Sequence, residues 1–303
     1  MRLGIFSNTI ATGTIDQVVA EARRAEAQGF DSFWVPQIFG YDALTVLALV
    51  GSQVPRIELG TSVVPTYPRH PMMLAQQCHT VNLAAGGRLA LGIGLSHQIV
   101  IETMMGMSFD KPVRHLREYL SVLMPMVRGD GVSFDGEVYR THASLGIPGT
   151  QPFPVLVAAL GPQMLAVTGA LADGTITWCT GPLTLRDHIV PTLNAATDAA
   201  GRDRARVVAA LPVCVTEDRA AARERAASVF AIYGQLPSYR AMLDREGANG
   251  PADIAVIGSE DEVMNRIAGL AEIGVTEFAA VEFPGNADEA IRTRTALTEL
   301  LVS

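Results

Sequence analysis

The stretch from Pro154 to Trp178 constrains the fold of this chain more than any other stretch. Val155 to Leu160 is an unbroken apolar run, which is typical of a strand buried on both faces of a parallel sheet. Gly161 ends the run, and Pro162 stands where a first helical residue belongs, because its missing N–H costs nothing there. Apolar residues then recur at helical spacing until a further strand begins at Thr175. The unit is therefore strand, tight turn, helix, strand.

The turn at Gly161 is a candidate anion site. The first N–H groups of a helix have no partner within the helix, and the helix dipole favours negative charge beside them. An ordinary junction between a strand and a helix has the same pattern, so phosphate binding and a plain helix start both fit the residues.

Strand-like and helix-like segments alternate along the whole chain. The predicted strands are 3–6, 32–35, 57–64, 89–95, 155–160, 175–178, 207–215 and 278–283. The predicted helices are 15–29, 42–50, 72–83, 112–128, 162–172, 184–200, 217–233, 238–246, 259–272 and 288–301. This order predicts an α/β fold in which eight parallel strands close into a barrel. We expect one domain over residues 1–303, with an insertion at about 131–152 before the fifth strand and a hairpin at Asp135-Gly136 within it.

The composition excludes several partners. The net charge of −8 is spread along the chain without a basic cluster, so we expect neither nucleic acid nor an anionic membrane as partner. No apolar run approaches the ~18 residues of a membrane span, and we expect no signal peptide. Cys78, Cys179 and Cys214 lack Cys-x-x-Cys spacing, which favours reduced thiols in a cytoplasmic protein. The six histidines show no metal-ligand spacing, so we predict no metal.

The chemistry of such a barrel lies at the carboxyl ends of its strands. The candidates there are Ser7, Asn8, Pro36, Gln37, Ser62, Val63, Ser96, His97, the Leu160 turn, Trp178 and Glu282. GIGLSH, residues 92–97, is no dinucleotide fingerprint because the third glycine is absent, and it is no nucleophile elbow because Gln98 stands where that motif needs glycine. A lone histidine is more often a structural donor than a catalyst, but His97 ends a strand among polar neighbours.

Three strings, AALGPQML at 158–165, GTSVVP at 60–65 and GIGLSH, resemble the luciferase-like monooxygenase superfamily and its branch that uses coenzyme F420, a deazaflavin. The resemblance implies a (β/α)8 TIM barrel of the bacterial-luciferase-like type with an insertion before strand 5. It also implies a cis peptide at Ser62–Val63 behind the cofactor ring, and Ser96 and His97 against the ring or its ribityl chain. The residues that it implies around the phosphate are Ala159, Leu160, Gly161, Gln163 and Met164.

The segment after the second strand departs from the alcohol-oxidising relatives. Those relatives carry an acidic residue and a basic histidine there, whereas this chain has Pro36, Gln37, Ile38 and Phe39. None of these four accepts a proton near pH 7, so oxidation of an alcohol by that route is disfavoured.

These observations predict a coenzyme F420-dependent oxidoreductase that transfers a hydride between deazaflavin carbon 5 and a small organic substrate, more readily as a reductase. His97 and Gln37 are the predicted catalytic residues, and we expect a homodimer. The alternatives are an FMN-dependent monooxygenase and a non-catalytic flavin-binding protein. The substrate itself has no readable signal in the loops.

Overall fold

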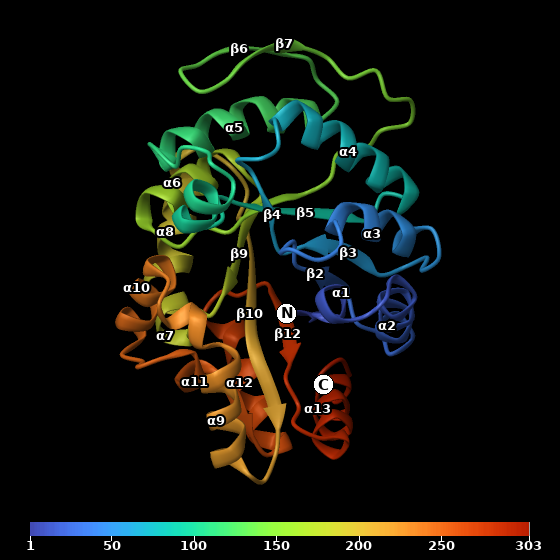
Figure 1. Ribbon diagram of the computed structural model, residues 1–303, viewed down its shortest axis with the longest axis vertical. Coiled ribbons are helices and arrows are strands. Elements are labelled where there is room, and N and C mark those ends of the chain that lie inside the picture. The colour runs from blue at the N-terminus through green and yellow to red at the C-terminus, as the bar shows by residue number, and fades with distance from the viewer. Residues whose placement is uncertain (303) are drawn as a thin grey trace.

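Eight parallel strands form a closed ring in the computed structural model, which describes residues 1–302 (Figure 1). The ring strands are β1 (Arg2–Phe6), β2 (Ser32–Val35), β3 (Glu58–Thr61), β5 (Leu89–Gly94), β8 (Val155–Val157), β9 (Gly174–Trp178), β10 (Arg206–Val215) and β12 (Glu277–Glu282). Each strand pairs with the next in this order, and β12 pairs with β1 to close the ring. The predicted (β/α)8 barrel is confirmed.

Helices surround the ring (Figure 1). The longer ones are α2 (Ile15–Ala27), α3 (Ala43–Gly51), α4 (Pro71–Ala84), α5 (Pro112–Val127), α6 (Pro162–Leu171), α8 (Val190–Ala199), α9 (Arg219–Val229), α10 (Pro237–Glu246), α12 (Glu260–Glu272) and α13 (Ala287–Glu299). The short ones are α1 (Thr9–Thr12), η1 (Val100–Met104), α7 (Pro182–Thr184), η2 (Leu185–Ile189), η3 (Ala231–Gly234) and α11 (Pro251–Ile254). No helix within residues 1–302 combines the length and the apolar content that crossing a bilayer requires.

Trp34 fills the interior of the barrel. Its indole is fully buried, and its N–H donates to Ser32 Oγ and to Glu277 Oε1, each at 2.8 Å. The neighbouring strands face it with Gly4 and Gly60, where an added Cβ would overlap Ser32 and the Trp34 ring respectively. The glycines therefore make room for one large side chain, which packs inside the ring of strands.

A charged network closes the amino end of the barrel. The guanidinium of Arg206 bonds to both Glu58 and Glu277, and Arg2 bonds to Glu58 at 3.3 Å. Because Glu277 is fully buried, its charge requires these partners. The carboxyl end of the barrel, called the mouth below, is the end left for a ligand.

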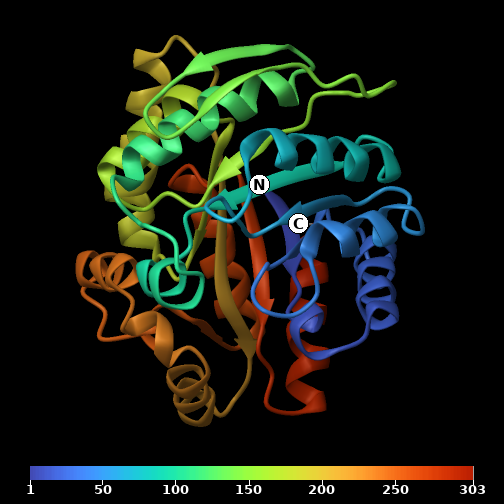
Figure 2. The same ribbon diagram turned by 45° about the horizontal axis from the view of Figure 1, so that its top comes forward.

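The insertion before the fifth ring strand is a hairpin, as predicted. β6 (Val132–Asp135) pairs with β7 (Arg140–Ala143) in an antiparallel ladder, and Figure 2 shows this hairpin lying along α5. The carboxylate of Glu118 on α5 accepts hydrogen bonds from the backbone N–H groups of residues 137, 138 and 139, at 3.1, 2.7 and 3.0 Å. One helical side chain thus fixes the turn of the hairpin.

The structure corrects the predicted strands in two places. The run 57–64 is not one strand, because β3 ends at Thr61 and β4 (Val64–Pro65) resumes the pairing with β5. A short strand, β11 (Val256–Gly258), was not predicted; it pairs with the end of β10, which is longer than its neighbours. The capping box of Ser259 and Glu262 at the start of α12 is confirmed.

Candidate active site

The floor of the mouth consists of Phe6, Val63 and Trp178. These three side chains are partly buried and pack on the inner cluster around Trp34. They come from the ends of β1 and β9 and from the link between β3 and β4. The rings of Phe6 and Trp178 are stacked, with centroids 6.0 Å apart and an interplanar angle of 23°. A planar ligand entering the mouth would lie on this apolar floor.

The link between β3 and β4 contains the cis peptide Ser62–Val63, so this implication of the resemblance is confirmed. The hydroxyl of Thr61 donates to the carbonyl of Gly92 at 2.8 Å and accepts from its N–H at 2.9 Å. A Cβ on Gly92 would overlap the Thr61 carbonyl, and one on Gly94 would lie 2.6 Å from Val63. Because Gly92 and Gly94 have no side chains, the link between β3 and β4 can pack closely against β5. This packing brings Val63 to the floor.

Two non-glycine residues with positive φ lie just after ring strands at the mouth. Ser96, with φ 63°, follows β5, and Cys179, with φ 49°, follows β9. A side chain in this left-handed region costs of order 1–3 kcal/mol and persists where the surrounding structure requires it. Such residues cluster at ligand sites, which supports this end of the barrel as the site.

His97 is half-buried and lies beside aromatic residues of a distant segment. Its ring centroid is 5.6 Å from that of Tyr239, which lies 5.3 Å from Tyr233, which in turn lies 5.5 Å from Trp178. Within residues 1–302 no group hydrogen-bonds to the ring nitrogens of His97. Burial lowers the pKa of His97, so its imidazole is neutral at pH 7. Both nitrogens are available to a ligand.

Gln37 lies two residues after the second ring strand, and its side chain accepts a hydrogen bond from the first residue of α3. Its Oε1 accepts the backbone N–H of Ala43 at 2.7 Å. The carbonyl half of the amide is therefore occupied, and the NH₂ half remains as a donor. Its neighbours Ile38 and Phe39 are exposed, at 49% and 65%.

The turn between β8 and α6 presents free backbone N–H groups. Those of Leu160, Gly161, Gln163 and Met164 have no acceptor within residues 1–302. The Leu160 carbonyl accepts from His188 Nε2 at 2.8 Å, which orients the turn, and the predicted Ala159 is buried behind it. A Cβ on Gly161 would meet no atom within 4 Å. The space in front of this helix is open and lined by donors, which fits an anion.

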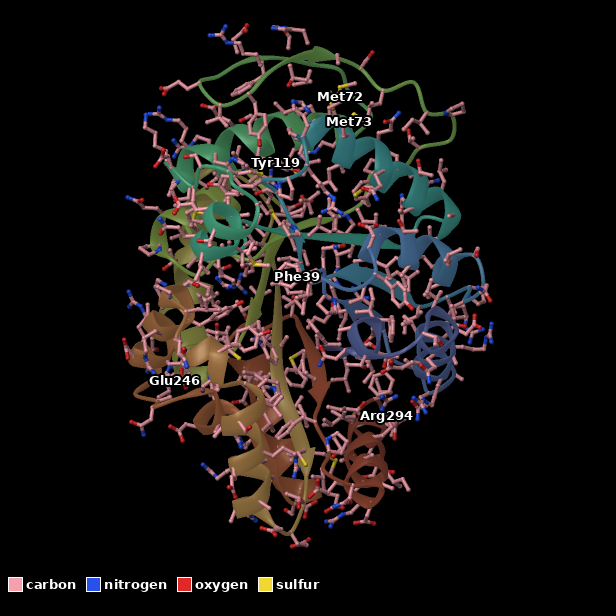
Figure 3. The ribbon with its side chains drawn as sticks, in the orientation of Figure 1. Phe39, Met72, Met73, Tyr119, Glu246 and Arg294 are labelled. Carbon is pink, nitrogen blue, oxygen red and sulfur yellow. The ribbon has the colours of Figure 1, made fainter. Side chains whose placement is uncertain are left out.

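Ser7 and Glu282 do not face the mouth. Ser7 is buried and donates to Glu21 on α2 at 2.5 Å. Glu282 pairs with Arg294 Nε at 2.9 Å, and Figure 3 shows Arg294 on α13 in the outer layer. Side chains alternate along a strand, so the residue after an inward Phe6 or Val281 points to the helices. Asn8 precedes α1 and makes no side-chain cap bond there.

An aromatic cluster lies under the hairpin, next to the mouth. The rings of Tyr67 and His115 are stacked, with centroids 3.9 Å apart, and Phe109 and Tyr139 border them. His115 Nε2 and Thr66 Oγ1 are 2.9 Å apart. Burial lowers the pKa of His115 from 6.5 to about 4, and the nearby carboxylate of Glu118 opposes this shift in part.

The buried His115 predicts a loss of stability in acid. Its folded-state pKa lies below the unfolded value, so the unfolded chain binds more protons between pH 6.5 and about 4. Stability is fully present above that window and falls by about 3 kcal/mol across it. The measurement is urea unfolding across the same pH range. His115→Gln, which cannot titrate, should flatten this dependence; an unchanged slope would assign the acid loss to other groups.

Two surface hollows lie away from these residues. One, of about 490 Å³, is bordered by α1 and α2, with Thr12, Gln17 and Glu21 in its lining. The other, of about 340 Å³, lies between Pro182 and Arg266. Neither contains a predicted site residue. Within residues 1–302 no three His, Cys, Asp or Glu side chains are grouped as metal ligands.

The sequence did not point to Phe6, Tyr233 and Tyr239 as parts of the site. Tyr233 and Tyr239 lie in η3 and α10, which follow β10, in a segment predicted only as helices with a polar face. Their proximity to Trp178 and His97 depends on how that segment folds back over the barrel. The only signal in the sequence is that two of its six tyrosines stand six residues apart.

Comparisons with known proteins agree with this geometry. A family model described as luciferase-like monooxygenase matches residues 1–277. The 5,10-methylenetetrahydromethanopterin reductase of Archaeoglobus fulgidus is 30% identical over 298 residues, covering 84% of this chain and 86% of the relative. A Mycobacterium tuberculosis protein, provisionally named as a coenzyme F420-dependent oxidoreductase, is 30% identical over 291 residues, covering 88% of this chain and 80% of the relative.

The solved structures include the same architecture. The coenzyme F420-dependent tetrahydromethanopterin reductase of Methanopyrus kandleri superposes with a TM-score of 0.80 at 22% identity. The match covers 99% of this chain and 96% of that protein. At this identity the likeness concerns the fold.

Proposed function

Because the chain belongs to the luciferase-like monooxygenase family, we propose that it is a coenzyme F420-dependent oxidoreductase that reduces a small organic substrate. Two of the relatives at 30% identity are a reductase and a protein named for this cofactor. The observation that carries the proposal is the open, donor-lined turn at Gly161, which lies at the same end of the barrel as the His97 ring.

The residues of the mouth fit a deazaflavin. When bound, the cofactor supplies hydride transfer at its carbon 5. The N–H groups of the turn from Leu160 to Met164 would hold the phosphate. Val63, with Ser62, would support the ring from behind, and Ser96 would donate to the ring or its side chain. With the cofactor bound, the apolar side chains of the floor would exclude water from the reacting centre.

The direction of hydride transfer depends on which side chains at the mouth can accept or donate a proton. Oxidising an alcohol needs a base within hydrogen-bond reach of the hydroxyl. Gln37 cannot serve, because its Oε1 already accepts from Ala43 and an amide takes no proton near pH 7. Its NH₂ group, or the Ser96 hydroxyl, can stabilise a developing oxyanion. His97 lies at the mouth and would supply the final proton to the substrate. Reduction of a carbonyl or an activated double bond therefore suits the site better than oxidation of an alcohol does.

Two measurements test this proposal. Titration by tryptophan fluorescence should give tighter binding of the deazaflavin than of FMN. A paired screen without NAD(P)H then offers oxidised deazaflavin with alcohols and reduced deazaflavin with enones, imines and quinones. Turnover should occur with the reduced cofactor. Tighter FMN binding with oxygen-dependent turnover would instead make the protein a monooxygenase, and cofactor binding without any turnover would leave a flavin-binding protein.

Replacing Gly161 by valine should weaken cofactor binding by about tenfold or more while the barrel stays folded. The φ of Gly161 is −76°, which every residue adopts, and the new side chain would enter the open space before α6. Titration with phosphorylated and dephosphorylated cofactor fragments measures the effect. Gly269, on α12, also has open space around its Cβ and is the matched control. Equal losses of cofactor affinity in the two variants would show that the turn does not bind the phosphate.

We also propose a homodimer and a cytoplasmic location. Leu49, Met73 and Leu83 are exposed at 42%, 55% and 43% on α3 and α4, which pack against each other. An apolar surface of this kind is typical of an interface. The three cysteines are unpaired and buried, as is common in a reducing compartment. Light scattering of the purified protein tests the dimer.

A further inference from the structure

The loops at the mouth carry almost no free positive charge. The segments that link ring strands to the following long helices contain three lysine or arginine residues, Arg69, Lys111 and Arg186. Arg186 is bound to the carboxylate of Asp187 at 2.6 Å. Arg69 is bound to the Asp42 carboxylate at 2.6 Å, and the Lys111 ammonium lies 3.8 Å from Glu137. A carboxylate or phosphate on a substrate would therefore find no unoccupied cation in these loops.

The titratable groups of the mouth add no charge that would attract an anion. His97 is neutral at pH 7 because burial lowers its pKa. Tyr239 beside it stays protonated, since burial raises its pKa. Glu102 and Asp110, in the loop after β5, are acidic and bond to Gln98 and Ser108. The formal charge of this rim is thus zero to negative.

Apolar side chains stand exposed on two of the same loops. After β2 these are Ile38, Phe39 and Tyr41, at 49%, 65% and 43% exposure, and Figure 3 shows Phe39 near the centre of the molecule, over the strands. After β5 they are Ile99, Met104, Met105 and Met107, at 63%, 61%, 38% and 38%. Exposed apolar side chains that border a site are typical of ligand recognition. Methionine adapts its shape to an irregular apolar partner.

We propose that the mouth selects uncharged, predominantly apolar substrates, with conjugated carbonyl compounds as the class, and rejects their anionic counterparts. This inference rests on the proposed function for the reaction, but the preference itself is a property of binding. The exposed residues contact the apolar body of the substrate, and the floor and the aromatic residues near His97 contact its planar part. When the cofactor phosphate occupies the Gly161 turn, an anionic group on the substrate would lose its hydration here without gaining a cationic partner.

The test uses benzalacetone and its para-carboxylate, which have the same enone and differ in charge. Isothermal titration measures their binding to the protein saturated with oxidised deazaflavin. A separate titration uses the cofactor-free protein in phosphate buffer, where inorganic phosphate is present to occupy the anion site at the Gly161 turn and no turnover occurs. We expect the neutral ketone to bind at least about tenfold more tightly than the carboxylate. Equal binding, tighter binding of the carboxylate, or no measurable binding of either would overturn the inference.

A charge-insertion variant sharpens the result. Phe39→Arg places a cation on the rim and should weaken ketone binding while strengthening carboxylate binding by about tenfold. The matched control is Ile291→Arg, because Ile291 is 67% exposed on α13, in the outer layer. The control should change neither affinity. If both variants shift the affinities equally, the preference reflects overall charge and not the mouth, which also overturns the inference.

These outcomes separate the two proposals. A neutral preference in binding, with no turnover of either compound by the reduced deazaflavin, would reject the proposed function and leave the binding inference intact. Turnover of both compounds at equal kcat/KM, with equal affinities, would keep the function and reject the inference.

Discussion

Replacing Trp34 by alanine is expected to lower the free energy of unfolding by about 3–5 kcal/mol. The indole is fully buried, and it is the largest side chain inside the ring of strands. Its removal leaves a cavity between Gly4 and Gly60, which have no side chains that could fill it. The change also removes the indole N–H that donates to Glu277, a buried carboxylate. Both losses act in the same direction.

Urea unfolding at neutral pH measures this effect. Ile291→Ala on the exposed face of α13 is the control and should stay within about 0.5 kcal/mol of the parent protein. Trp34→Phe keeps most of the side-chain volume but loses the indole N–H, so its free energy of unfolding should lie between those of the parent protein and Trp34→Ala. A Trp34→Ala protein within about 1 kcal/mol of the parent would contradict the account of the interior, because a cavity of that size should cost more.

Replacing His97 by alanine is expected to lower kcat by about 10²–10⁴-fold, with little change in stability. The ring makes no hydrogen bond within residues 1–302 and lies at the mouth, half-buried beside Tyr239. Its lowered pKa leaves the ring neutral at pH 7. If the protonated ring is the donor, the rate should rise as the pH falls toward that pKa.

The conservative variant His97→Asn separates proton transfer from positioning. It retains hydrogen-bonding capacity but cannot titrate, so its rate should be low and nearly independent of pH. Full kcat in this variant from about pH 5 to about pH 9 would exclude proton transfer by His97. Binding of the deazaflavin, followed by fluorescence, reports whether the ring contributes only to cofactor affinity.

The sequence predicted the barrel because its signal is local and repeated. Apolar runs, helical stripes and caps such as that of Ser259 lie within single segments, and eight successive units leave few alternatives to a closed ring. The end of β3 at Thr61 could not be predicted from the local sequence pattern, because it depends on hydrogen bonds to Gly92 in another strand. Only the family resemblance predicted the cis bond there.

The site was predicted unevenly for the same reason. Residues at strand ends could be identified, but the direction of each side chain depends on where the alternation starts. Ser7 and Glu282 were therefore included although they point to the helices. Tyr233 and Tyr239 were missed, because their place beside Trp178 and His97 follows from the path of a segment about 50 residues after β9. The catalytic and cofactor roles of His97 and the Gly161 turn stay predictions.

The packing of Trp34 against Gly60 restricts the order in which mutations can be accepted during evolution. A side chain at Gly60 overlaps the Trp34 ring as long as the tryptophan is present, so this position cannot enlarge first. A lineage could exchange this interior for another only by shrinking Trp34 first, through an intermediate of low stability, and refilling the space afterwards. Trp34 and Gly60 should therefore change together among relatives, and the change at Trp34 should precede the change at Gly60.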